Sequence, residues 1–316
     1  MGTLALGFRP VSPGHAQAFS QVSPIVCSGG REFATIELNI LRAFTEEEMR
    51  TQTRELVFGA HQMTIVCRAA PSEAADQEAT PNADDWVVDG DDSSGLDIWP
   101  AATALCEYLL RCQQQLVGPS TKVIELGAGA GVPGLLTARM GAEVVLTDFD
   151  PNALELAVRN TELNDLLERC SVESLDFYHI APSERTDDAE SPRPTHLFQR
   201  FSLALATDIL YASAMVKPVL EAAAFVLQSG GVLLIGHQPR FTLILNRASG
   251  DAQVEQRDTP WEDFLELSRA RGYHNRCLGK YHCAENREPT DVLVYAVSTV
   301  WRPHWHCCPR FDLIDE

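Results

Sequence analysis

Residues 122–148, KVIELGAGAGVPGLLTARMGAEVVLTD, decide the fold of this chain. They begin with a short apolar run, residues 123–126, which can be buried on both faces as a parallel strand requires. Three closely spaced glycines follow, then a helix-forming stretch, and then a second apolar run at residues 144–146. This order predicts a strand, a glycine turn, a helix and a second strand, the unit from which doubly wound sheets are built.

The glycine turn has the spacing G-x-G-x-G at Gly127, Gly129 and Gly131, preceded by Glu125. A turn that binds a dinucleotide pyrophosphate has the spacing G-x-G-x-x-G, so the third glycine here falls one residue early. S-adenosyl-L-methionine has no pyrophosphate, and its turn need only contact the amino-acid part and the ribose. We expect Asp148 to bind the ribose hydroxyls and Glu125 to meet polar groups of this donor. The other interpretation is a turn that only packs a helix on a strand.

Charge and composition narrow the class of protein. The 316 residues carry 25 Lys and Arg against 44 Asp and Glu, and the net charge of -19 argues against nucleic-acid binding, which needs a basic surface. This negative charge suits a basic protein partner, although the solubility that an acidic surface provides explains it as well. No apolar run reaches the about 18 residues of a membrane span, and the first residues make a poor secretory signal. We therefore expect a protein of the cytoplasm or nucleus that does not bind membranes.

Cysteine usage agrees with that compartment. The nine cysteines follow no regular framework, as is typical of a reducing environment. The densest group, His304, His306, Cys307 and Cys308, lacks the C-x-x-C spacing of a zinc site, so we expect no bound metal.

The chain divides into five expected segments. They are a loose N-terminus at 1–31, a small β extension at 32–68, an acidic linker at 69–95, a main domain at 96–301 and a tail at 302–316. In the extension, strand-like runs at 33–40 and 55–67 flank a charged piece and predict a hairpin. The linker has few aliphatic residues, and we expect it to be solvated and to contribute to partner choice.

Within the main domain, strands alternate with helices. The predicted strands are residues 123–126, 144–146, 170–175, 201–207 and 232–237, with a closing pair at 273–281 and 291–300. Predicted helices include residues 100–110, 151–164, 215–227 and 261–272. The pattern predicts an α/β fold with a doubly wound, Rossmann-like sheet of seven strands and ligands at the carboxyl ends of the strands.

Asp208 and Tyr211 follow the fourth predicted strand in the sequence D-I-L-Y. In a doubly wound sheet this strand lies beside the first one, so both side chains would face the methyl group of a donor bound at the glycine turn. They would then orient an acceptor amine by hydrogen bonds, which favours methyl transfer because alignment supplies much of the rate. The other interpretation is that Asp208 caps the next helix and Tyr211 packs against the core.

Four motifs together resemble the seven-strand methyltransferase-like family of protein-lysine methyltransferases: LDIWPAATAL, VIELGAGAGVPGL, VVLTD and DILY. The resemblance covers residues 55–300 and implies S-adenosyl-L-methionine as donor and a lysine of a protein as acceptor. By position it implies that the donor is bound by Trp99, Gly127, Ala128, Gly129, Asp148, Phe177 and Thr207, and that Asp208 and Tyr211 are catalytic. Phe177 replaces the usual tryptophan and Thr207 the usual alanine.

Three alternatives remain open at this point. A small-molecule N-methyltransferase would have a closed, lidded pocket, whereas a protein substrate needs an open acidic cleft beside Asp208. A nicotinamide dehydrogenase is disfavoured by the glycine spacing. A non-catalytic interaction protein on the same fold is disfavoured by the intact D-I-L-Y motif and by Trp99.

Overall fold

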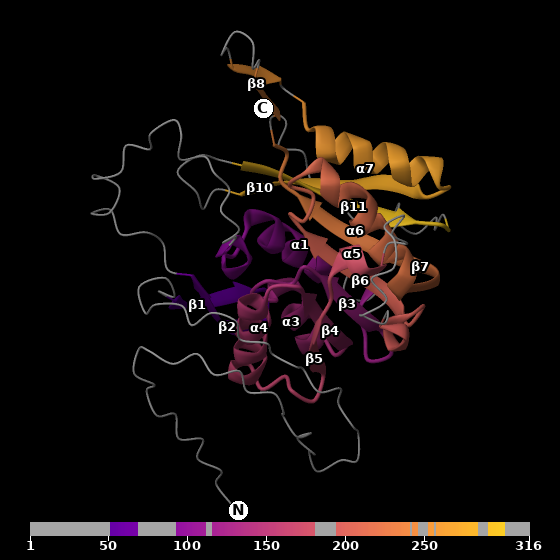
Figure 1. The fold of residues 1–316 in the computed structure, drawn as a ribbon. Coiled ribbons are helices and arrows are strands. Elements are labelled where there is room, and N and C mark those ends of the chain that lie inside the picture. The colour runs from indigo at the N-terminus through magenta and orange to yellow at the C-terminus, as the bar shows by residue number, and fades with distance from the viewer. Residues whose placement is uncertain are drawn as a thin grey trace, which may run out of the picture. The chain divides into compact units, whose positions relative to one another are not determined.

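The computed structural model describes residues 51–68, 93–111, 116–180, 194–240, 242–245, 252–255, 257–283 and 290–300. A seven-stranded sheet in the order β10-β11-β7-β6-β3-β4-β5 organises them (Figure 1). Its five parallel strands are β3 (Lys122–Leu126), β4 (Glu143–Asp148), β5 (Cys170–Ser174), β6 (Phe201–Thr207) and β7 (Leu227–His237). An antiparallel pair, β10 (His274–Cys283) and β11 (Thr290–Ser298), completes the sheet, with β11 also antiparallel to β7. The predicted doubly wound sheet of seven strands is confirmed.

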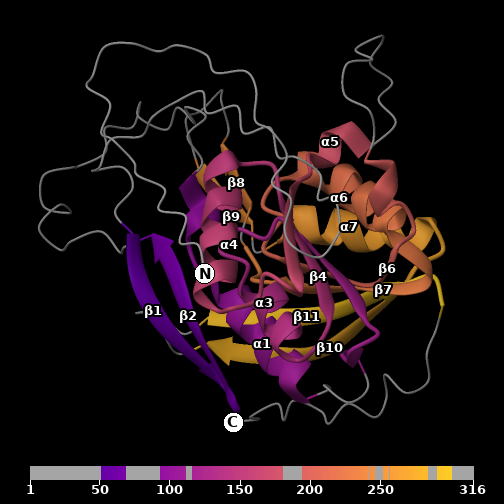
Figure 2. The same cartoon turned by 90° about the horizontal axis from the view of Figure 1, so that it is seen from below.

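Helices cover both faces of the sheet (Figure 2). One face packs against α1 (Pro100–Arg111), α3 (Val132–Arg139) and α4 (Pro151–Leu163). The other packs against α5 (Phe177–Ile180), α6 (Ser213–Val226) and α7 (Thr259–Ala270). Two short 3-10 turns, η1 (Ser93–Leu96) and η2 (Thr195–Leu197), precede α1 and β6. No helix in these ranges combines the length and the apolar character needed to cross a bilayer.

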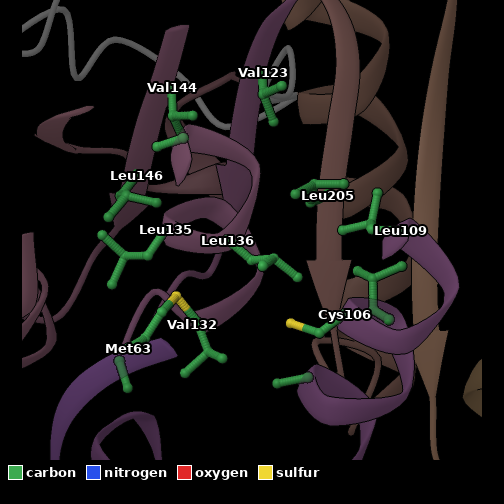
Figure 3. Close-up of a cluster of buried hydrophobic side chains, with 14 of the residues drawn as sticks. Met63, Cys106, Leu109, Val123, Val132, Leu135, Leu136, Val144, Leu146 and Leu205 are labelled. Atoms are coloured by element: carbon green, nitrogen blue, oxygen red, sulfur yellow. The ribbon is translucent and has the colours of Figure 1, made fainter. Parts of the chain in front are cut away.

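The apolar strands are buried because each supplies side chains to both helical layers. In β3, Val123 belongs to the core beneath α1 and α3, whereas its neighbour Ile124 belongs to the core beneath α6 and α7. Figure 3 shows the first of these cores, where strand residues such as Val123 and Leu146 meet Leu135 and Leu136 of α3. Alternate burial on two faces explains why the parallel strands read as continuous apolar runs.

The N-terminal hairpin lies entirely within residues 51–68, which corrects the prediction of a single strand at 55–67. Its strands β1 (Thr51–Phe58) and β2 (His61–Arg68) are antiparallel and reverse direction at Gly59, whose φ of 58° suits a residue without a Cβ. Phe58, Met63 and Ile65 join the core beneath α1 and α3. The other run of the predicted hairpin, residues 33–40, lies outside the described residues.

Two further details differ from the sequence prediction. Strand β7 begins at Leu227, five residues early, because its first residues form an irregular extension in which Leu227 pairs with Phe201 and Val232 with Leu203. A hairpin of β8 (Thr242–Leu245) and β9 (Ala252–Glu255) follows β7 and was not predicted. The expectations for the N-terminus, for most of the acidic linker and for the tail concern residues outside the described ranges, and the five segment boundaries remain predictions.

Candidate functional site

A cavity of about 400 Å³ lies at the carboxyl ends of the parallel strands. This volume falls within the range of about 300–1,000 Å³ that is typical of small-molecule pockets. Most of its walls come from the carboxyl ends of strands and the segments that follow them: the glycine turn after β3, Asp148 and Phe149 at the end of β4, Phe177 after β5, and Asp208 and Tyr211 after β6; the segment that leads into α1 supplies the remaining wall. Ala128 and Thr207 line it as well. The adjacency of β3 and β6 creates the switch point at which doubly wound sheets bind ligands.

The glycine turn is shaped so that side chains are excluded from it. Gly127 and Gly129 have φ angles of 64° and 51°, in the left-handed region. A Cβ on Gly127 would lie 2.8 Å from Ile209 Cγ2, and one on Gly129 would lie 2.5 Å from the carbonyl oxygen of Gly95. The turn is tied to the sheet because the Ala128 N–H donates to the Thr147 carbonyl over 2.8 Å. The bare backbone of this turn therefore forms one wall of the cavity.

Asp148, the last residue of β4, lies against the glycine turn and is 8% exposed. Its Oδ2 accepts a hydrogen bond from the Gly129 N–H (2.9 Å), and its Oδ1 accepts from the N–H groups of Phe149 (2.8 Å) and Asp150 (3.1 Å). Burial raises the pKa of this carboxyl, and these three N–H groups oppose the rise. Because each carboxylate oxygen has two lone pairs, the group keeps acceptor capacity for a ligand in the cavity.

Glu125 is not part of the cavity, which corrects its assignment to the donor site. The side chain is completely buried, and its Oε2 accepts a hydrogen bond of 2.9 Å from the Gly134 N–H in the first turns of α3. Burial raises the pKa of the carboxyl to about 8. The strand alternation turns residue 125 toward the α3 face, whereas the ligand edge begins only at the end of β3. Glu125 therefore holds α3 against the sheet beneath the glycine turn.

Three aromatic side chains supply apolar walls. Trp99 stands directly before α1 and is 37% exposed, and the Arg240 guanidinium carbon lies 5.7 Å from the centroid of its ring. Phe177 begins α5 and is buried. Phe149, which the sequence analysis did not select, also lines the cavity. Its position directly after Asp148, past the end of β4, is the signal that could have identified it.

Asp208 and Tyr211 both line the cavity, as predicted from the strand order. Asp208 has a φ of 52°, and its Oδ1 accepts a hydrogen bond of 2.8 Å from the Gln238 N–H. Its Oδ2 is buried and has no hydrogen-bond partner among the described residues. Helix α6 begins at Ser213 behind an Ala212 cap without any side-chain hydrogen bond, so Asp208 is not a helix cap. Burial raises the pKa of the Asp208 carboxyl, and the Gln238 N–H opposes that rise.

Three polar residues at this end of the site were missed by the sequence analysis. Arg240 lines the cavity, and behind it lie His237, the last residue of β7, and Asp258, the N-cap of α7. His237 Nε2 is 2.7 Å from Asp258 Oδ2. The position of His237 at a strand end was a usable signal, but Asp258 is 21 residues further along the chain and only the fold brings it there.

The topology, with β11 antiparallel between β7 and β10 and a glycine turn after β3, is that of the class I methyltransferases. Within that class, the chain belongs to methyltransferase family 16, whose family model is described as lysine methyltransferase and matches residues 85–249, just over half of the chain.

Individual relatives are similar over parts of their length. The protein N-lysine methyltransferase METTL21A of Xenopus tropicalis is 28% identical over 174 residues, covering 54% of this chain and 66% of the relative. The histone-arginine methyltransferase METTL23 of Mus musculus is 29% identical over 136 residues, covering 42% and 48%. Among solved structures, Pyrococcus horikoshii TYW2 in complex with MeSAdo is 17% identical with a TM-score of 0.42, covering 65% of each chain. The chain thus spans only about half to two thirds of these relatives.

Proposed function

We propose that this chain is an S-adenosyl-L-methionine-dependent methyltransferase that modifies a lysine side chain of a protein. The observation that carries the proposal is a single cavity with the bare glycine turn on one wall and a buried, incompletely paired Asp208 carboxylate on another. The first wall suits a donor without a pyrophosphate, and the second suits an amine. The arrangement thus offers separate contacts for donor and acceptor around one reaction centre.

The residues present fit this donor. The turn from Gly127 to Gly131 admits backbone contact because its glycines carry no side chain, and Gly127 and Gly129 have no room for one. The Asp148 carboxylate would hold the ribose hydroxyls, and the rings of Phe149 and Phe177 would contact the adenine. When bound, the donor supplies an electrophilic methyl group.

Asp208 and Tyr211 would bind and orient the acceptor. Asp208 Oδ2 has unused acceptor capacity, and a carboxyl whose pKa is raised by burial is a stronger base than an exposed aspartate. Burial of an amine in the cavity favours its neutral form with a free lone pair, and the Asp208 carboxylate can take up the proton that is released. Tyr211 is 46% exposed at the mouth, so its ring can guide a side chain into the cavity. The chain itself therefore aligns the acceptor amine with the donor methyl group and provides a carboxylate that can accept the proton of the amine.

A protein acceptor is favoured over a small molecule because the mouth is open to solvent at Trp99 and Tyr211, which are 37% and 46% exposed. The net charge of -19 suits a basic segment of a partner. A lysine acceptor follows the name of the family and of the METTL21A relative, whereas the METTL23 relative is named for arginine. The buried free thiols Cys67, Cys106 and Cys170 suit the reducing cytoplasm or nucleus that we propose as its location.

The test is methylation of a cell lysate by the purified chain with methyl-tritiated S-adenosyl-L-methionine, followed by mass spectrometry of the labelled band. We expect one or a few labelled proteins with the methyl group on lysine. Label on arginine would move the acceptor assignment to that of the METTL23 relative, and label only in the small-molecule fraction would overturn the protein acceptor. Calorimetry that shows NAD binding without donor binding would overturn the donor.

Asp208→Ala separates the two halves of the site. We expect its donor affinity to stay within a few-fold of the wild type while turnover collapses, because the lost contact aligns the acceptor. Tyr211→Phe should lose less, since its ring still walls the cavity. Asp148→Ala is the matched donor-side variant and should weaken donor binding by about 1.5–3 kcal/mol for each lost charge-assisted hydrogen bond. A full-rate Asp208→Ala enzyme would refute the role given to this carboxylate.

A further inference from the structure

Behind the proposed acceptor site, three polar side chains from different elements form a buried row. Asp208 follows β6, His237 ends β7 and Asp258 caps α7. His237 Nε2 lies 2.7 Å from Asp258 Oδ2, and His237 Nδ1 lies 4.0 Å from Asp208 Oδ1. The side chains of His237 and Asp208 are 1% and 2% exposed. The row therefore links the proposed acceptor-binding carboxylate to α7 through one imidazole ring.

Asp258 determines which nitrogen of the ring faces Asp208. Its Oδ2 accepts a hydrogen bond from the Arg240 N–H (2.8 Å) and its Oδ1 accepts from the Trp261 N–H (3.2 Å), so both oxygens of the Asp258 carboxylate act as hydrogen-bond acceptors. His237 Nε2 must then carry the hydrogen that joins it to Asp258. The imidazole also stacks on the Trp261 ring, with centroids 4.5 Å apart and planes at 9°. The ring is thereby held with Nδ1 toward Asp208.

The two facing atoms attract each other only when a proton lies between them. His237 Nδ1 is buried and has no hydrogen-bond partner among the described residues. If it carried only a lone pair, two acceptors would face each other across 4.0 Å in a region shielded from water. A proton on Nδ1 turns this repulsion into attraction between an N–H and the Asp208 Oδ1. Asp208 Oδ1, which also accepts from the Gln238 N–H, then faces a positive charge at a distance longer than a hydrogen bond, and Oδ2 is the oxygen without a hydrogen-bond partner among the described residues.

We propose that His237 is a positioning residue for the methyl transfer: braced by Asp258, it holds a proton against Asp208 Oδ1, so that Asp208 stays ionised and presents Oδ2 to the acceptor amine. The inference deepens the proposed function and rests on it. His237 touches neither donor nor acceptor in this assignment, because the cavity is lined by Asp208 and Arg240 and not by His237.

The charges that face Asp208 give the sign of the expected pH effect. Burial raises the pKa of Asp208 and Asp258 adds to the rise, whereas the Gln238 N–H and the charges of Arg240 and His237 oppose it. Removing the charge of His237 therefore raises the pKa of Asp208 further. If turnover needs ionised Asp208, the acidic limb of its pH profile then moves to higher pH.

Two amide substitutions test the role of Nδ1 separately from the bond to Asp258. In His237→Gln the amide reaches the Nε2 position and keeps the contact with Asp258, but nothing remains at Nδ1. In His237→Asn the amide lies near the Nδ1 position and offers an N–H to Asp208. We expect His237→Gln to bind S-adenosyl-L-homocysteine within about threefold of the wild type and to lose turnover on lysate protein by about 10- to 100-fold, as for a misplaced catalytic group. His237→Asn should recover a large part of that loss.

A second measurement does not depend on turnover. In the full chain labelled with [13C]aspartate, the pH midpoint of the Asp208 carboxyl resonance should be higher in His237→Gln than in the wild type and closer to the wild type in His237→Asn.

A double variant shows whether His237 acts through Asp208. In an Asp208→Asn background, His237→Gln should cause no further loss of turnover. Equal losses in both His237 variants, with an unchanged midpoint and a lowered melting temperature, would show that His237 only joins β7 to α7 and would overturn the proposal. If the wild type methylates nothing, the proposed function fails, while the midpoints still decide whether His237 controls Asp208.

Discussion

At the scale of single residues, Glu125 makes folding depend on pH. The side chain is completely buried, and its Oε1 has no hydrogen-bond partner among the described residues. Desolvation raises its pKa from 4.5 to about 8, so the folded chain keeps this proton in a range where the unfolded chain has released it. Stability from this group is complete below pH 4.5 and is lost as the pH rises toward 8.

We predict that the free energy of unfolding falls between pH 5 and 8 by up to about 1.4 kcal/mol per pH unit through Glu125. Glu125→Gln keeps the shape without the titration and should remove this part of the slope. Urea unfolding of both proteins at several pH values measures the difference. Parallel curves for the two proteins would show that Glu125 titrates in the folded state as it does in the unfolded state.

At the scale of elements, the packing of α3 on the sheet requires a glycine at position 134. A Cβ there would clash with Leu146 Cδ2 and would lie 2.6 Å from Glu125 Oε2. We predict that Gly134→Ala destabilises the fold by about 1–3 kcal/mol, because overpacking exceeds the gain in helix propensity. Gly118→Ala is the control, since a Cβ on Gly118 meets nothing within 4 Å. Thermal or urea unfolding of the two variants provides the comparison, and equal stabilities would contradict the prediction.

The hairpin is attached to α4 by asparagine side chains that act as a strand partner for the edge of β2. Asn160 accepts from the Val66 N–H (2.7 Å) and donates to the Val66 carbonyl (3.0 Å), and Asn164 binds both backbone groups of Thr64 (3.0 and 2.7 Å). Asn160 also donates to the carbonyl of Ala130 in the glycine turn (2.9 Å). Two asparagines four residues apart along the helix thus bind the backbone of two residues that are two apart along the strand, because both pairs lie on one face of their element.

We predict that Asn160→Ala lowers the free energy of unfolding by at least about 2 kcal/mol, because it leaves several buried backbone groups unpaired at about 1–3 kcal/mol each. Donor affinity should fall as well, since the Ala130 contact supports the glycine turn. Asn152→Ala on the same helix is the control, because the Asn152 side chain bonds only the Asp150 cap among the described residues. Urea unfolding and calorimetry give the two readouts, and equal stability of both variants would refute the strand-partner role.

At the scale of the whole molecule, the cavity draws its walls from segments that follow four different strands, so a bound donor should stabilise the entire sheet. We predict that S-adenosyl-L-homocysteine at 100 times its dissociation constant adds about 2.7 kcal/mol to the free energy of unfolding, whereas NAD at the same concentration adds nothing. Asp148→Ala should need a higher ligand concentration for the same shift. Thermal unfolding with each ligand measures this stabilisation. Stabilisation by NAD alone would contradict the prediction, drawn from the glycine spacing, that the site binds a donor without a pyrophosphate.

The sequence could predict those features that depend on neighbours along the chain. The apolar runs, the left-handed glycines and the Pro100 start of α1 specify their elements locally, so the strands of the sheet were found to within a few residues except at the start of β7. The topology rule for doubly wound sheets then placed Asp208 and Tyr211 beside the glycine turn. The hairpin was predicted less well because the turn at Gly59 interrupts what reads as one strand.

Only the tertiary structure decided where side chains point and which distant residues meet. Glu125 belongs to the same motif as the turn, yet the pleat of β3 directs it beneath α3 and away from the cavity. His237 and Asp258 carry no motif, and they lie next to Asp208 because β7 runs beside β6 and α7 begins behind it. Local periodicity thus determined the elements and the edge at which a ligand binds. Contacts between elements determined the charge and orientation of the groups that would act there, because desolvation and hydrogen bonding depend on neighbours in space.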